Sequence, residues 1–120
     1  MSPKRILAID DEPELLEIHR EHLEGRYAVD TAVYATEAVQ TFEQNRPDLV
    51  LLDINMPGVD GLTLLAFLRK IDRSVPVIII TSNSSARVAQ KCLESGAFAY
   101  APKPLNLTYL DHLVAAALGQ

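Results

Sequence analysis

The chain has 120 residues, of which 48% are hydrophobic and 22% are charged, and its formal net charge is −5. This length and composition are typical of one globular domain with a hydrophobic core, and they exclude a disordered chain. The acidic balance offers no basic surface, so we expect no direct binding of nucleic acid by this chain.

Five segments have the pattern of β-strands. In chain order, apolar runs at residues 6–9, 49–53, 76–81 and 98–101 predict buried strands, and an alternating segment at residues 27–32 predicts a partly exposed edge strand. The run at 49–53 ends on a carboxylate, Asp53, which is costly to bury unless it is paired or coordinated. Asp53 is therefore the residue whose partners must be found elsewhere in the chain.

Apolar residues at helical spacing predict a helix after each strand. Pro13 suits the first turn of the first helix, and Gly25 ends that helix. We expect Thr36 to be the N-cap of the second helix and Asn106 that of the last. The N-cap of the fourth helix is predicted at Ser84 or Ser85.

Most inward-facing helical residues are apolar. In the fourth helix we expect Cys92 in the core, beside Val88, Ala89 and Leu93. His19 and His22 recur at the spacing of the apolar residues, but their helix is acidic, so we expect them at the surface or its boundary. The remaining residues predicted on inner faces are Leu15, Leu16, Leu23, Ala38, Val39, Phe42, Leu64, Leu65, Leu68, Ile71, Leu110, Leu113, Val114 and Ala117.

Alternating strands and helices predict an α/β fold with a parallel sheet that helices cover on both faces. In open sheets of this kind, ligands bind outside the carboxyl ends of the strands. The residues expected at those ends are all polar: Asp10, Asp11, Asp53, Thr81, Ser82 and Lys103.

Three carboxylates at one edge of a sheet need a cation. Two like charges about 4 Å apart repel by roughly 4 kcal/mol at an effective dielectric constant near 20. Oxygen ligands without Cys or His favour Mg²⁺, or Mn²⁺ in its place, and make zinc improbable. Lys103 adds a positive charge and Thr81 a hydroxyl, which together with the carboxylate of Asp53 are the groups needed for phosphoryl transfer onto Asp53.

These motifs, in this order and spacing, resemble the receiver domain of two-component response regulators, the CheY-like family. The resemblance rests on the acidic pair after the first strand, the segment from Leu51 to Gly61 around Asp53, Thr81-Ser82 and Lys103-Pro104. It covers essentially the whole chain, and it implies one receiver domain at residues 1–120. The implied fold is a (βα)5 doubly wound sheet of flavodoxin-like strand order 2-1-3-4-5.

The resemblance also implies roles for the acidic residues. Asp53 would be the phosphoacceptor and a Mg²⁺ ligand. Asp11 would bind Mg²⁺ directly, Asp10 mainly through water, and the backbone carbonyl of Asn55 would be a further ligand.

Further residues would hold the phosphoryl group or respond to it. Thr81 and Lys103 would contact phosphoryl oxygens, beside Asn55 and the backbone N–H of Ser82. Thr81 and Tyr100 would form a switch pair that alters the surface of the fourth helix, fifth strand and fifth helix. Pro104 would follow a cis peptide bond.

The same resemblance implies partners and a location. A sensor histidine kinase or a histidine phosphotransfer protein would supply the phosphoryl group, and an output domain or partner protein would read the switch. A phosphorylation-dependent homodimer is a further implied state. The resemblance implies a phosphoprotein that is not a turnover enzyme. We expect it in the cytoplasm, since the N-terminus is not a signal peptide, no apolar run is long enough to span a membrane, and Cys92 is the single cysteine.

Two other readings stay open from the residues. An aspartyl-phosphate phosphatase or phosphotransferase of haloacid-dehalogenase type needs a second carboxylate two residues after the nucleophile, where this chain has Asn55. A phosphorylation-independent interaction module or a flavodoxin-like cofactor carrier is the other reading, although the first strand is followed by Asp10-Asp11-Glu12 and not by a glycine-rich phosphate loop.

Overall fold

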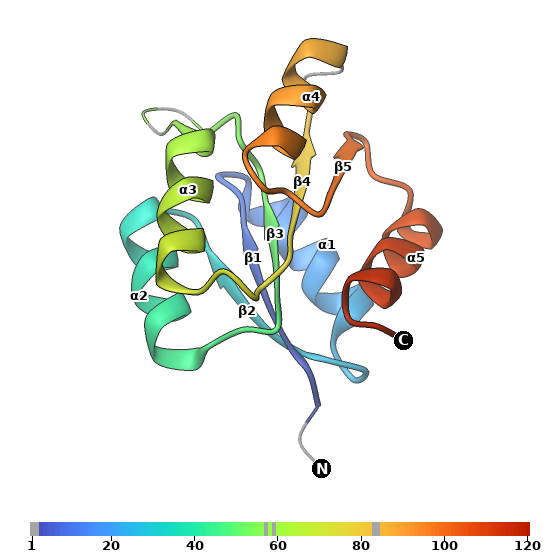
Figure 1. Ribbon diagram of the computed structural model, residues 1–120. Helices are drawn as coiled ribbons and strands as arrows, with labels where there is room; N and C mark the ends of the chain where they lie inside the picture. Colours follow the sequence, from blue (N-terminus) through green and yellow to red (C-terminus); the bar gives the residue numbers. More distant parts are fainter. Residues whose placement is uncertain (1–2, 57, 59, 83–84) are drawn as a thin grey trace.

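The computed structural model describes residues 3–56, 58, 60–82 and 85–120, and strands alternate with helices along them (Figure 1). The strands are β1 (Arg5–Ile9), β2 (Ala28–Ala32), β3 (Leu49–Leu52), β4 (Val77–Thr81) and β5 (Ala99–Pro102). The helices are α1 (Pro13–Leu23), α2 (Ala35–Asn45), α3 (Gly61–Ile71), α4 (Ala86–Glu94) and α5 (Leu107–Ala117). None of the described helices is long and apolar enough to cross a membrane.

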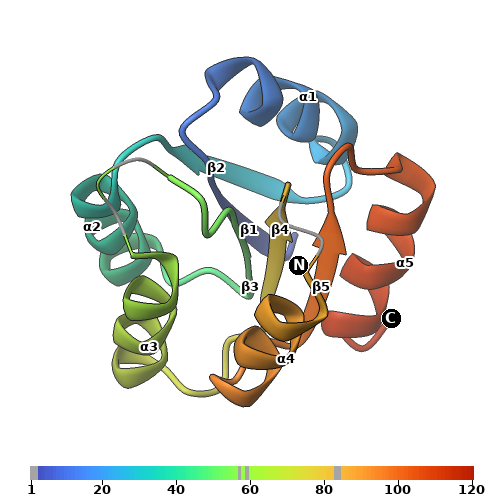
Figure 2. The same ribbon diagram turned by 90° about the horizontal axis from the view of Figure 1, so that it is seen from above.

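All five strands are parallel and form one sheet in the order β2-β1-β3-β4-β5. Helices α1 and α5 cover one face of this sheet, and α2, α3 and α4 lie on the other (Figure 2). The predicted doubly wound α/β fold with strand order 2-1-3-4-5 is therefore confirmed.

The two faces of the sheet have separate hydrophobic cores, because successive strand residues point to opposite sides. In β1, Leu7 and Ile9 pack into the cluster under α2 and α3, whereas Ile6 and Ala8 pack into the cluster under α1 and α5. β3 and β4 alternate in the same way. The central strands are thus buried on both faces, which is why their sequences are continuously apolar.

Helix ends show where local prediction succeeded and where it failed. Asn106 caps α5 as predicted, with its side-chain oxygen accepting from the Tyr109 N–H at 3.0 Å. The predicted N-cap at Thr36 is wrong, because α2 begins at Ala35 and the N-cap residue is Tyr34, two residues earlier. Ser85 is the N-cap residue of α4, and Ser84 lies outside the described residues.

Burial corrects two further expectations. His19 was expected at the surface or boundary, but it is 2% exposed and lies on the inner face of α1 beside Leu16 and Leu23. In α4, Cys92 is buried as expected, whereas Leu93 is 50% exposed. Each of these positions is set by how the helix rests on the sheet, which the helical spacing alone does not define.

Candidate functional site

The carboxyl ends of β1, β3, β4 and β5 meet at one edge of the sheet, and backbone hydrogen bonds tie them together. The Asp53 N–H donates to the Ile9 carbonyl at 2.9 Å, which joins the end of β3 to the end of β1. The Lys103 N–H donates to the Thr81 carbonyl at 2.8 Å, which joins the end of β5 to the end of β4. Residues from distant parts of the chain thereby come to one place.

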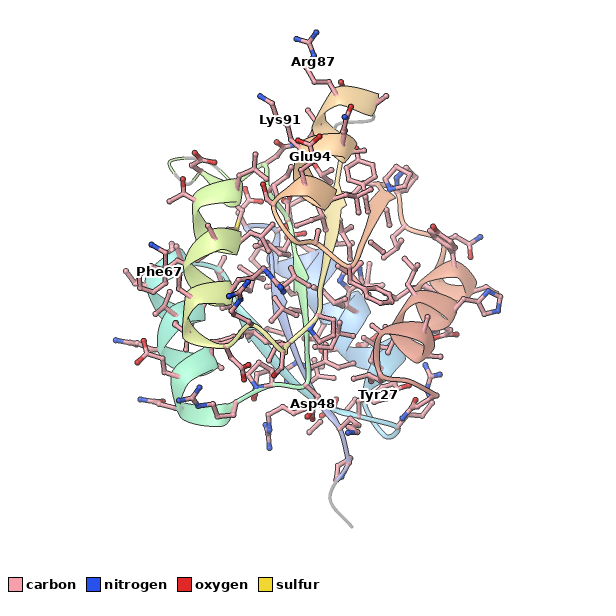
Figure 3. All side chains as sticks on the ribbon, viewed as in Figure 1. Tyr27, Asp48, Phe67, Arg87, Lys91 and Glu94 are labelled. Atoms are coloured by element: carbon pink, nitrogen blue, oxygen red, sulfur yellow. The ribbon has the colours of Figure 1, made fainter. Side chains whose placement is uncertain are left out.

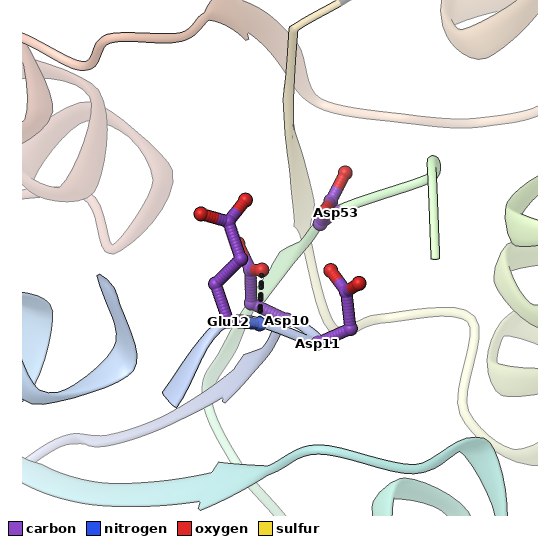
Figure 4. A group of neighbouring side chains, drawn as sticks. All are labelled: Asp10, Asp11, Glu12 and Asp53. Atoms are coloured by element: carbon purple, nitrogen blue, oxygen red, sulfur yellow. Dashed lines mark hydrogen bonds between the residues drawn. The ribbon is translucent and has the colours of Figure 1, made fainter. Parts of the chain in front are cut away.

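Four carboxylates gather at this edge (Figure 4). Asp10, Asp11, Glu12 and Asp53 each offer an oxygen, and these oxygens all lie within 4.8 Å of one another. Asp10 and Asp53 are each 3% exposed, Asp11 is half-buried and Glu12 is exposed. We call these four residues the acidic cluster.

Backbone donors orient the two buried carboxylates. The Glu12 N–H donates to Oδ1 of Asp10 at 3.0 Å, and the Asn55 N–H donates to Oδ1 of Asp53 at 2.9 Å. Each carboxylate is therefore held by the chain two residues further on, which fixes its direction at the strand end.

Lys103 supplies the positive charge of the site. Its Nζ lies 3.0 Å from Oδ2 of Asp10, 3.1 Å from Oε1 of Glu12 and 3.2 Å from Oδ2 of Asp53. Burial by itself lowers the pKa of this ammonium, but the three carboxylates outweigh burial and raise the pKa above its usual range. Lys103 is therefore a permanently charged group that links three members of the acidic cluster.

Asp10 remains a costly carboxylate in spite of Lys103. Burial, with a smaller contribution from the nearby Asp53, outweighs the opposing effects of the Glu12 N–H and Lys103 and raises the pKa of Asp10 from 3.8 to about 6. Lys103 and the Glu12 N–H therefore do not fully offset the cost of ionising this buried carboxyl.

The cluster fits a hard divalent cation. Its donors are carboxylate oxygens at a partly open edge, a donor set that suits Mg²⁺ and Mn²⁺. The raised pKa of Asp10 indicates the same need for additional positive charge. Asp10, Asp11 and Asp53 were predicted at this place from the sequence, and the structure brings all three together.

The remaining predicted residues lie on the β4 and β5 side of the cluster. Thr81 is fully buried, and its Oγ1 accepts a hydrogen bond from Nδ2 of Asn55. Ser82 directly follows β4 and is exposed. The peptide bond between Lys103 and Pro104 is cis, as the resemblance implied.

Tyr100 lies on β5 with its side chain directed into the protein. Its ring packs against the hydrophobic cluster under α2 and α3, and burial raises the pKa of its hydroxyl. The hydroxyl oxygen is buried and has no hydrogen-bond partner among the described residues. The aromatic side chain is therefore in the inward position in this structure.

Sequence reasoning missed two residues near the site. Glu12 was not predicted as a site residue, yet it belongs to the acidic cluster and contacts Lys103. Its position directly after Asp10 and Asp11 was the available signal. The second missed residue is His19. Its helical spacing from Leu16 and Leu23 was the available signal that its ring faces the sheet.

Comparisons with known proteins agree with this geometry. The sequence model of the family described as the response regulator receiver domain matches residues 6–115. The transcriptional regulatory protein PrrA of Mycobacterium tuberculosis is 38% identical over 115 residues, which are 95% of this chain and 49% of that protein. The transcriptional regulatory protein TrcR of the same organism is 38% identical over 120 residues, which are 98% of this chain and 45% of that protein.

A solved structure is similar over nearly its whole length. The CheY-like response regulator receiver domain protein from Methanospirillum hungatei superposes with a TM-score of 0.91 at 32% identity, covering 98% of this chain and 95% of that one. The chain spans about half the length of the curated relatives it matches.

Proposed function

This chain belongs to the response regulator receiver domain family, and from that membership we propose that Asp53 is its phosphoacceptor in a two-component signalling system. The observation that carries the proposal is the contact of Lys103 Nζ with Oδ2 of the buried Asp53, at 3.2 Å, inside a cluster of four carboxylates. We further propose that the 120 residues act as one receiver domain.

The proposed reaction is phosphoryl transfer to a carboxylate. An Oδ atom of Asp53 attacks the phosphorus of a phosphohistidine, a new O–P bond forms, and the N–P bond breaks with its electron pair returning to the imidazole nitrogen. Asp53 needs no general base because a carboxylate near neutral pH is already the nucleophile. The chain acts once on its own side chain, so it is not a turnover enzyme.

Asp10, Asp11 and Asp53 would hold Mg²⁺, together with the backbone carbonyl of Asn55. When bound, Mg²⁺ supplies charge neutralisation for the incoming phosphoryl oxygens. Lys103 would exchange part of its contact with Asp53 for a phosphoryl oxygen. Its ties to Asp10 and Glu12 keep the ammonium within reach of that oxygen.

The response to phosphorylation would begin at Thr81. We propose that its hydroxyl turns to a phosphoryl oxygen, beside Asn55 and the N–H of Ser82, and gives up the contact with Nδ2 of Asn55. Tyr100 lies on the neighbouring strand β5, where it pairs with Ile79 of β4, and would adjust to the space that Thr81 leaves. Phosphorylation would thus shift the protein between two packings of the same fold.

The surface that would change is formed by α4, β5 and α5. Apolar side chains are exposed on it, namely Leu93, Phe98 and Tyr109. Two charged side chains of α4, Arg87 and Lys91, extend from the helix away from α5 (Figure 3). A mixed apolar and charged surface of this kind suits a protein partner, an output domain or a second copy of the chain. The phosphoryl donor would be a sensor histidine kinase or a histidine phosphotransfer protein.

The test is phosphorylation by a small acyl phosphate in the presence of Mg²⁺, followed by intact mass measurement. We expect one phosphoryl group per chain, stable in acid and labile in base, and no adduct when a chelator removes Mg²⁺. Asp53→Asn should abolish the adduct, whereas the matched control Asp72→Asn, an exposed carboxylate at the end of α3, should leave it intact. Equal labelling of wild type and Asp53→Asn would overturn the proposal.

A further inference from the structure

A small cavity lies beneath the acidic cluster, on the side of the sheet covered by α1. Its volume is about 10 Å³, and Asp10 and Asp53 form part of its wall. His19 and Leu16 of α1 line it from the helix side. A space of this size approaches what one water molecule requires and is too small for a larger ligand.

His19 is the unexplained group at this cavity. It is 2% exposed, and its Nε2 is buried with no hydrogen-bond partner among the described residues. Burial lowers the pKa of the imidazole, and the positive charge of Lys103 lowers it further, so the ring is neutral near pH 7. A neutral imidazole has one N–H donor and one acceptor nitrogen, and a buried one normally satisfies both.

We propose that this cavity is a site for one ordered water molecule, which connects Nε2 of His19 to the carboxylates of Asp10 and Asp53. The water accepts from the Nε2–H of His19 and donates one proton to each carboxylate. Three hydrogen bonds are the usual number for a buried water. Each carboxylate oxygen that already has one partner can accept another, so the existing contacts with Glu12, Asn55 and Lys103 are kept.

His19 is then a positioning residue that acts on the acidic cluster from behind. The front of the cluster faces solvent and Lys103, and the backbone N–H groups hold one oxygen of each carboxylate. The water would orient the same two carboxylates from the core side, through a residue that never contacts the phosphoryl donor. The consequence for Mg²⁺ binding rests on the proposed function, whereas the water site itself does not.

A second metal site is the competing interpretation, and the geometry disfavours it. The ligand atoms that come within 4.8 Å of one another in the described part of the chain are those of the acidic cluster, without His19. The cavity also lacks room for a cation with its remaining waters.

The test uses three variants of the metal-free protein. His19→Gln keeps a side-chain amide that can donate to the water, and His19→Leu removes every polar atom. Leu16→Met is the matched control, because it alters the packing of the same cavity wall without changing its polar groups. Nuclear magnetic resonance then detects magnetisation transfer between a long-lived water and protein protons of the cavity wall, which every variant retains. In the proteins that keep His19, the ¹⁵N shift of Nε2 reports whether this nitrogen carries the proton.

We expect a long-lived water signal and a protonated Nε2 in wild type and Leu16→Met, and no such water in His19→Leu. Mg²⁺ affinity, measured by titration, should fall by about tenfold in His19→Leu, at the lower end of what partners of metal ligands contribute, and recover most of that loss in His19→Gln. A wild-type ring without a bound water, or a His19→Leu variant that binds Mg²⁺ as tightly as Leu16→Met does, would overturn the inference. If wild type shows the water but binds no Mg²⁺, the proposed function fails and the water site stands.

Discussion

Replacing Asp10 with Asn should stabilise the metal-free protein. The Asp10 carboxyl is buried at the strand end, and its ionised form is compensated only in part by Lys103 and the Glu12 N–H. An asparagine keeps an oxygen that can accept from the Glu12 N–H, but it carries no charge to bury. The substitution therefore removes the free-energy cost of burying a charged carboxylate, a cost that the native site retains for its chemistry.

The size of the gain follows from the pKa of Asp10. Folding raises this pKa from 3.8 to about 6, and each pKa unit corresponds to ~1.4 kcal/mol, so the ionised carboxyl costs roughly 3 kcal/mol in the folded state. A carboxyl whose pKa is higher in the folded state than in the unfolded state makes the protein less stable as the pH rises from the unfolded-state pKa through the folded-state pKa. The gain from Asp10→Asn should therefore be small below about pH 4 and complete above about pH 7.

Urea unfolding followed by circular dichroism measures this gain, because the chain has no tryptophan. With a chelator present, we expect Asp10→Asn to raise the free energy of unfolding by about 1–3 kcal/mol at pH 8 and by much less at pH 4. Asp72→Asn is the control, since Ser74 lowers the pKa of that exposed carboxyl, and it should give no gain. A loss of stability in Asp10→Asn at pH 8, or a gain that does not depend on pH, would refute the reasoning.

Three further predictions concern packing, each measured by urea unfolding. Gly61→Ala should lower the free energy of unfolding by about 1–3 kcal/mol, because a Cβ there would overlap the backbone of Ile54; an unchanged midpoint would contradict this contact. Leu65→Ala should cost about 2–5 kcal/mol, whereas Leu93→Ala should stay within about 0.5 kcal/mol, since Leu65 is fully buried and Leu93 is half exposed; similar losses would be inconsistent with the burial of α3 and α4. Tyr100→Phe removes a buried hydroxyl that has no partner among the described residues, so stability should be unchanged or higher by up to about 1 kcal/mol, and a clear loss would mean that the hydroxyl is bonded in solution.

The sheet and the place of the site could be predicted because both follow from local patterns. Strands buried on both faces need continuous apolar runs, and in a parallel sheet the residues after those runs meet at one edge. Asp10, Asp53 and Lys103 were located by this argument alone, from positions more than 40 residues apart, and their side chains do meet.

Other features depend on tertiary packing that no local pattern contains. Glu17 and Glu21 made the helix around His19 look solvated, but the ring sits on the face of α1 that rests on the sheet. α2 begins before Thr36, and the side chain of Glu37 accepts from the Val33 N–H at 2.8 Å. The reach of Glu12 to Lys103 and the contact of Asn55 with Thr81 likewise depend on how strand ends come together.

The central claim is that Asp53 receives the phosphoryl group, and locating the modified residue tests it most directly. The phosphorylated wild-type protein is treated with borohydride, which reduces an aspartyl phosphate to homoserine, and the digested peptides are sequenced by mass spectrometry. We predict homoserine at position 53, with Asp10, Asp11 and Asp60 unchanged. Homoserine at another aspartate, or phosphorylated protein that yields none at position 53, would contradict the proposed role of this site.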